Sequence, residues 1–172
     1  MKKTTVLLLG GALALSLSAC GASKTSSEAP NTTTDNSSPN ISQPTAQTNQ
    51  NDATNETRRK QLNADIRSAE QRNNVAGDKS VKSDNDIKSE VRSKLEANLP
   101  ASALAISSKD GAVTVMGTVV NEAQLQKIEP LAKQIGGVKS VAIKATVNSA
   151  AKPAPPKPGT ANVMKDQQTG NK

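Results

Sequence analysis

The chain has 172 residues, of which 22 are basic and 15 acidic, for a net charge of +7, and it contains no His, Trp, Tyr or Phe. Without histidine, and with Cys20 as the single cysteine, it lacks the side chains that dominate zinc and copper sites. It also lacks the usual general base and any Ser-His or Cys-His nucleophile pair. We therefore expect no catalytic residues, no metal and no cofactor, and we interpret the chain as a non-enzyme.

Residues 1–19 have the three parts of a secretory signal peptide. Two lysines follow the first Met, an apolar run extends from Val6 to Leu17, and small residues precede Cys20. The apolar run is shorter than the roughly 18 residues that a membrane-spanning helix needs. Removal of the signal leaves 20 basic and 15 acidic side chains, a net charge of +5 that suits an anionic surface. Export favours a lipid surface over nucleic acid.

The quartet Leu17-Ser18-Ala19-Cys20 resembles the lipobox of bacterial lipoproteins, in which the cysteine is acylated and becomes the new N-terminus. The alternative is an ordinary signal peptide with a chance cysteine. The resemblance implies a membrane anchor at Cys20 and a protein on the periplasmic face of the cell envelope. Gly21 follows the cysteine, where an aspartate would hold the protein in the inner membrane, so the outer membrane is favoured.

Two flanking segments are polar enough to predict disorder. Residues 20–55 form a linker of mainly Ser, Thr, Asn and Gln, with Ile41 as its only sizeable apolar side chain, and residues 149–172 form a tail rich in Pro and Lys. Such segments bury too little apolar surface to offset the entropy of ordering. We expect both to be flexible.

Residues 56–82 form a basic segment with helical periodicity. Leu62, Ile66 and Ala69 fall on one helical face, among the basic residues Arg58, Arg59, Lys60, Arg67 and Arg72. Three interpretations stay open: a solvated helix, a helix docked on the neighbouring domain, and a helix lying on a membrane. We predict the five basic residues as a site for anionic phospholipid or for an envelope protein, with Leu62 and Ile66 dipping shallowly into the membrane.

Residues 83–148 carry the signals of one small domain. A first helix starts at Ser83 or Asp84 and stops at Pro100, and its Glu90 lies at helical pairing distance from Lys94. Asp110-Gly111 predicts a hairpin turn between two strands. A second helix starts at Asn121 and ends at Gly136-Gly137, with a kink or break expected at Pro130. A last strand alternates through Val141, Ile143, Ala145 and Val147.

This order predicts an α+β fold, a two-layer α-β-β-α-β domain with two helices on one face of a three-stranded mixed sheet. The last strand returns through a helix, so we expect it to run parallel to a hairpin strand. The sequence leaves the oligomeric state open.

Residues 84–148 resemble the BON domain, a bacterial osmotic-stress and nodulation module of periplasmic and outer-membrane proteins. The structural motif that carries the resemblance comprises a first-helix stripe of Ile87, Val91 and Leu95 together with Gly111, Val113, Val115, Gly117, Val119, Gly137, Val138, Val141 and Asn148. The resemblance implies binding of phospholipid or other envelope components and a role in envelope integrity or stress tolerance. The alternative is a periplasmic adaptor that binds another envelope protein.

Overall fold

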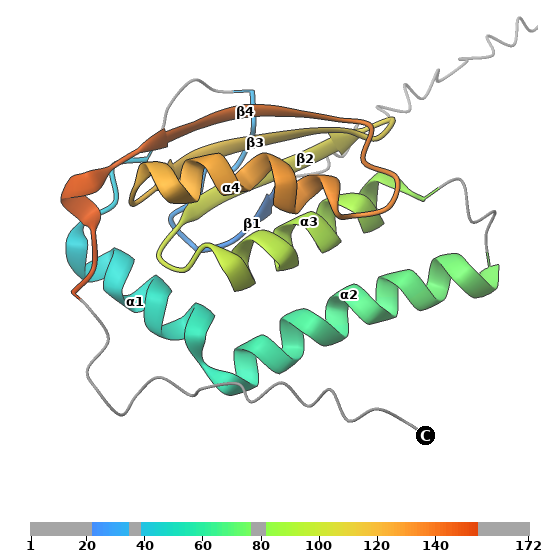
Figure 1. The fold of residues 1–172 in the computed structure, drawn as a ribbon, viewed down its shortest axis with the longest axis horizontal. Coiled ribbons are helices and arrows are strands. Elements are labelled where there is room, and N and C mark those ends of the chain that lie inside the picture. Colours follow the sequence, from blue (N-terminus) through green and yellow to red (C-terminus); the bar gives the residue numbers. More distant parts are fainter. Residues whose placement is uncertain (1–21, 35–38, 77–81, 155–172) are drawn as a thin grey trace, which may run out of the picture.

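A four-stranded sheet in the order β1-β2-β3-β4 forms the centre of the fold (Figure 1). The computed structural model describes residues 22–34, 39–76 and 82–154. β2 (Ala103–Lys109) and β3 (Ala112–Val119) form an antiparallel hairpin, and β4 (Ser140–Val147) runs parallel to β3. The predicted α+β class, the hairpin and the parallel return strand are confirmed. The sheet has a fourth strand, β1 (Ser23–Lys24), which the sequence did not predict.

The β2–β3 turn consists of Asp110 and Gly111, as the Asp-Gly dipeptide predicts. Both residues have positive φ, 53° and 81°, the combination of a tight hairpin turn. The carboxylate of Asp84, at the start of the first domain helix, accepts hydrogen bonds from the Asp110 and Gly111 amides at 2.7 and 3.0 Å and from the Ser108 hydroxyl at 2.6 Å. The predicted helix-start residue therefore also holds the turn.

Helices α3 (Asp84–Asn98) and α4 (Glu122–Lys133) cover one face of the sheet. Ser83 caps α3, since its hydroxyl accepts a hydrogen bond from the Asp86 amide at 3.1 Å. The aliphatic stripe of α3 and the inward side chains of the strands form the core with the inner face of α4. Its buried members are Ile87, Val91, Leu95, Leu99, Leu104, Ile106, Val113, Val115, Val119, Ile128, Ala132, Ile135 and Ala145.

The start of α4 follows the sequence signal, whereas its middle and its end do not. The helix ends at Lys133 with Gln134 as its C-cap in the right-handed region, before the predicted end at Gly136-Gly137. Asn121 caps the helix through a 2.8 Å bond from the Gln124 amide, but the Gln124 side chain accepts from the amide of Val120 rather than that of Asn121. The expected break at Pro130 is wrong, because one continuous helix extends to Lys133. Pro130 lies in the last turn of α4, so the backbone hydrogen bond that it removes is one near the C-terminal end of the helix.

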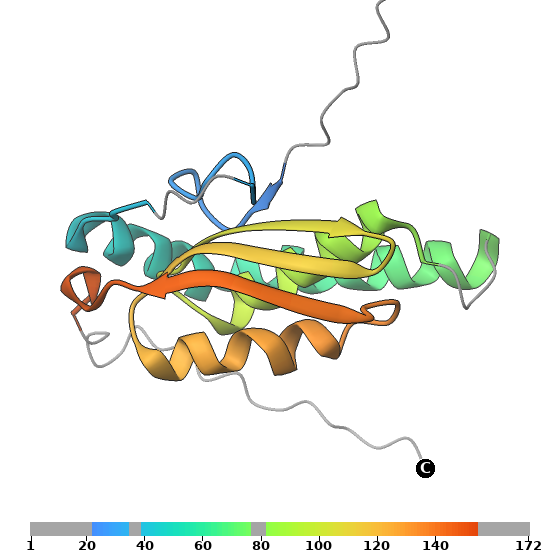
Figure 2. The ribbon, with the colours of Figure 1, turned by 90° about the horizontal axis from the view of Figure 1, so that it is seen from above.

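The described part of the chain up to residue 54 packs on the opposite face of the sheet (Figure 2). It contains β1 and α1 (Gln43–Thr54), so the prediction of a flexible linker is wrong for residues 22–34 and 39–54. This segment is folded because it shares a second buried cluster with the domain. The cluster consists of mostly small side chains, namely Ala29, Ile41, Ala46, Ala101, Ala103, Val120 and Ala151. Alanine contributes little hydropathy, yet it allows backbones to approach closely.

The segment after β4 is ordered for a few residues. A 3₁₀ helix, η1 (Ser149–Ala151), buries Ala151 in the same cluster, which corrects the expectation of disorder from residue 149. The predicted signal peptide, the predicted lipidation residue Cys20 and residues 155–172 of the tail lie outside the described residues. Among the described helices, none is long and apolar enough to cross a membrane.

Candidate binding surface

The basic segment is a helix, α2 (Glu56–Ala76), and it docks on the domain beside α3 (Figure 1). Leu62 and Ala69 are fully buried, and Ile66 is half-buried. The apolar face of α2 is therefore turned toward the protein. Of the three interpretations that the sequence left open, the docked helix is confirmed. The expectation that Leu62 dips into a membrane is wrong, because its side chain already packs inside the protein.

Two of the five predicted site residues are engaged in ion pairs with α3. Arg58 Nε lies 2.6 Å from Oε1 of Glu96, and Arg72 lies 2.9 Å from Asp86. The hydrogen bond to Glu96 raises the pKa of Arg58, and the hydrogen bond from Arg72 lowers the pKa of Asp86. Both arginines therefore stabilise the packing of α2 on α3, a structural role that the sequence did not predict.

The other three predicted residues are less constrained. Lys60 pairs at 2.6 Å with Glu56 one turn earlier, on an exposed face, and this contact lowers the pKa of Glu56. Arg67 is exposed and forms no ion pair within the described part of the chain, while Arg59 is half-buried and forms none there either. The structure therefore does not gather the five residues into one site. Lys60 and Arg67 lie on the exposed side of α2, whereas the Arg59 Nε is buried without a partner in the described chain.

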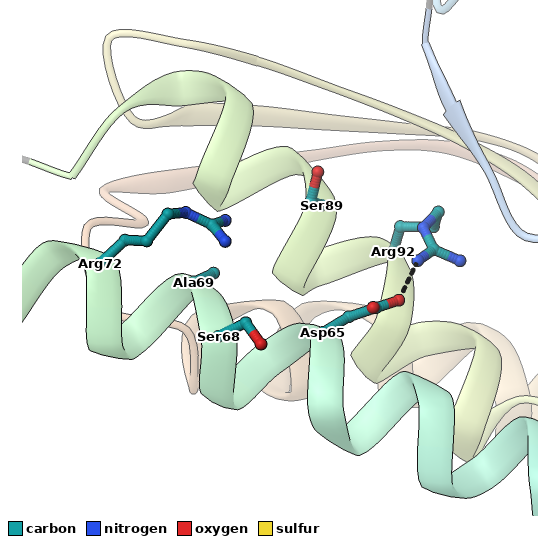
Figure 3. Close-up of a pocket in the computed structure, with 6 residues that line it drawn as sticks. All are labelled: Asp65, Ser68, Ala69, Arg72, Ser89 and Arg92. Atoms are coloured by element: carbon teal, nitrogen blue, oxygen red, sulfur yellow. Dashed lines mark hydrogen bonds and ion pairs between the residues drawn. The ribbon is translucent and has the colours of Figure 1, made fainter.

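A shallow groove of about 200 Å³ lies between α2 and α3 (Figure 3). Arg72 and Arg92 line it from the two helices, together with Asp65, Ser68, Ala69 and Ser89. Arg92 is held by Asp65 at 3.1 Å and by Glu96 at 2.8 Å. Because carboxylates already balance both arginines, the groove has no strong excess of positive charge.

One buried carboxylate was assigned the wrong partner from the sequence. Glu90 does not pair with Lys94; its Oε2 accepts a 2.7 Å bond from Lys82, and its Oε1 is buried without a partner in the described chain. Burial raises the pKa of Glu90. The neighbouring carboxylates of Glu70 and Asp86 raise this pKa further. We interpret the Lys82–Glu90 pair as part of the packing of α3.

The motif glycines are required where backbones meet. A side chain at Gly117, which has φ of 129°, would place a Cβ 2.0 Å from the Ala103 carbonyl oxygen. A Cβ at Gly111 would lie 2.6 Å from the Gly137 oxygen. Gly137 itself has φ of 89°, and a Cβ there would lie 3.0 Å from the Ile87 side chain. Within the motif, Val113 and Val115 are buried, and Val138 and Val141 are partly buried against the core. These seven residues therefore hold the architecture together rather than form an exposed site.

The comparison with protein families agrees with this architecture. Residues 83–149 match the family model of the BON domain. This segment is a BON domain. The match covers both helices and all three strands that the sequence predicted, so the suspected resemblance is confirmed for that part of the chain. No curated protein and no solved structure matches the chain. In residues 22–34, 39–76 and 82–154, no group of three or more Cys, Asp or Glu side chains is placed to hold a metal ion.

Proposed function

We propose that the chain is a non-catalytic, lipid-anchored protein of the cell envelope whose BON domain binds phospholipid or another envelope surface and so supports envelope integrity or stress tolerance. The BON match over residues 83–149 carries this proposal, since the family is associated with such binding. The signal peptide and Cys20 supply the anchor, with the periplasmic face of the outer membrane as the favoured location.

The contact surface in this proposal extends beyond the BON domain to the exposed side of α2, the helix that docks on the domain beside α3. Lys60 and Arg67 face solvent there, whereas Arg58 and Arg72 are engaged with α3. Basic residues close to an anionic membrane contribute up to about 1 kcal/mol each, an attraction that salt screens. Because Leu62 packs inward, the contact is electrostatic and shallow.

The test is co-sedimentation of the Cys20→Ser chain with vesicles that contain or lack phosphatidylglycerol. We expect binding to the anionic vesicles that falls steeply with added salt and is weakened several-fold by Arg67→Glu. Lys127→Glu, which makes the same charge change on the exposed side of α4, is the matched control and should have less effect. Equal loss in both variants would move the contact away from α2, and salt-insensitive binding would exclude an electrostatic surface.

A periplasmic adaptor that binds an envelope protein is the second candidate. The observation that favours it is the outer edge of β4, which pairs with no other strand among the described residues. A pull-down from envelope extract with the anchored chain, in which bound lipids and proteins are identified together, separates the two candidates.

A further inference from the structure

The two edges of the sheet differ in whether another described segment covers them. At the β2 edge, residues 23–24 add a short strand, and Thr25 continues the pairing through a 2.9 Å bond from its amide to the Leu104 carbonyl and another from the Leu104 amide to its hydroxyl. At the other edge, β4 pairs only with β3 within the described chain. Figure 2 shows β4 in full view along its length, with no other described segment crossing it.

The side chains of β4 do little to prevent a further strand from pairing with this edge. Its sequence, Ser140-Val-Ala-Ile-Lys-Ala-Thr-Val147, contains no proline or glycine and a single charge. That charge, Lys144, points over the sheet face, where its Nζ lies 3.4 Å from the Thr33 carbonyl oxygen. Ile143 is 40% exposed. Long, flat, apolar edges of this kind form hydrogen bonds with further strands unless charges or prolines oppose them.

We propose that β4 pairs antiparallel with β4 of a second copy of this chain, about a two-fold axis at Ile143. In this register Ile143 lies opposite Ile143 of the second copy, and Val141 lies opposite its Ala145. Both pairs are apolar and lie on the helix-covered face, because strand side chains alternate with a period of two. The two sheets then join into one.

The sequence of β4 favours a copy of itself as the partner. With the axis at Ile143, each Lys144 lies opposite Ala142 of the other copy, so no like charges are directly opposed. An axis at Lys144 would place the two lysines opposite each other, which is unfavourable. An axis at Ile143 also covers the exposed side chain of Ile143 with its own counterpart. Symmetric pairing of identical patches is the usual form of a homodimer.

Disulfide trapping in the full chain tests the proposal. Ile143→Cys should give a cross-linked dimer under mild oxidation, on a non-reducing gel, well above the background that Cys20 gives in the parent chain. A mixture of Ala142→Cys and Lys144→Cys chains should cross-link several-fold more than either chain alone, because the register sets these positions opposite each other. Val75→Cys is the matched control, since Val75 is the other exposed large hydrophobic side chain, at 88%, and lies on α2.

Light scattering of the full chain in detergent supplies the second measurement. Ile143→Asp should weaken the dimer at least ten-fold while the circular dichroism spectrum is retained, and Val75→Asp should leave the dimer unchanged. A chain that is monomeric at every concentration would overturn the proposal. So would Ile143→Cys cross-linking no better than Val75→Cys, or a monomer whose β4 edge is covered by a different envelope protein.

Discussion

Arg58 of α2 donates a hydrogen bond from Nε to Oε1 of Glu96, a carboxylate of α3 that is only 3% exposed, over a distance of 2.6 Å. Arg92 binds the other oxygen of the same carboxylate at 2.8 Å. A buried charge is costly unless it is paired and hydrogen-bonded. Arg58, which the sequence predicted as a membrane contact, is therefore one of the two arginines that neutralise the buried carboxylate of Glu96.

This arrangement predicts that Arg58→Ala destabilises the fold. Hydrogen bonds to charged groups contribute about 1.5–3 kcal/mol, and Arg58 is partly exposed, so we expect a loss near the lower end of that range. The measurement is urea unfolding followed by circular dichroism. Lys60→Ala, which breaks an exposed pair on the same helix, should change the midpoint very little. Equal midpoints for the two variants would contradict the role assigned to Arg58.

Asp84 makes the stability of the hairpin depend on pH. The Ser108 hydroxyl first, and then the Gly111 and Asp110 amides, lower the pKa of Asp84, because they stabilise its charged form. A carboxylate with a lowered folded-state pKa contributes stability that is present above its unfolded pKa, about 3.9, and is lost as the pH falls through the folded value. Asp84→Asn should therefore be less stable than the parent near neutral pH, and the difference should shrink below about pH 4.

Thermal unfolding of both chains across this pH range measures the effect. Ser108→Ala removes one of the three donors, so its loss should be smaller than that of Asp84→Asn and should also shrink in acid. A difference between Asp84→Asn and the parent that stays constant with pH would show that the contribution of Asp84 does not depend on its charge.

The motif glycines differ from other glycines in what a side chain would meet. Gly117→Ala places its Cβ against the Ala103 carbonyl at a positive φ, so we expect a loss of at least about 2 kcal/mol in the free energy of unfolding. Gly136→Ala is the matched control, because its Cβ would have only the Lys82 ammonium nearby, at 3.8 Å. Denaturant unfolding of the two variants tests this, and similar losses would contradict the close approach of β2 and β3.

The proposed anchor predicts a change in fractionation. Cys20→Ser removes the sulfur that would carry the acyl chains, so the protein should leave the membrane fraction or accumulate as an uncleaved precursor. Detergent partitioning and gel mobility measure this. Normal processing of the variant with unchanged partitioning would exclude Cys20 as the lipidation site.

The domain of residues 83–148 was predictable because its signals are local. The aliphatic stripe of α3, the Asp-Gly turn and the alternation of Val141 and Ile143 each act within a few residues and agree with one another. Val115, a motif residue of the hairpin, is fully buried in the core. The position of α2 was not predictable, since a basic helix with a narrow apolar face suits either a membrane or another helix.

The sequence by itself determined the α-β-β-α-β order, the N-caps of both domain helices and the glycines at the close approaches, because backbone sterics and side-chain periodicity act over short distances. Only the tertiary structure decided that residues 22–34 and 39–54 fold onto the sheet and that Arg58 and Arg72 face α3. It also decided that no other strand of the described chain pairs with the outer edge of β4. These features depend on which surfaces meet across the chain. Ala46 and Ala103 are small enough for close packing, and Glu96 is buried where Arg58 of α2 and Arg92 of α3 reach it. Such long-range matches leave no periodic signal in a single sequence.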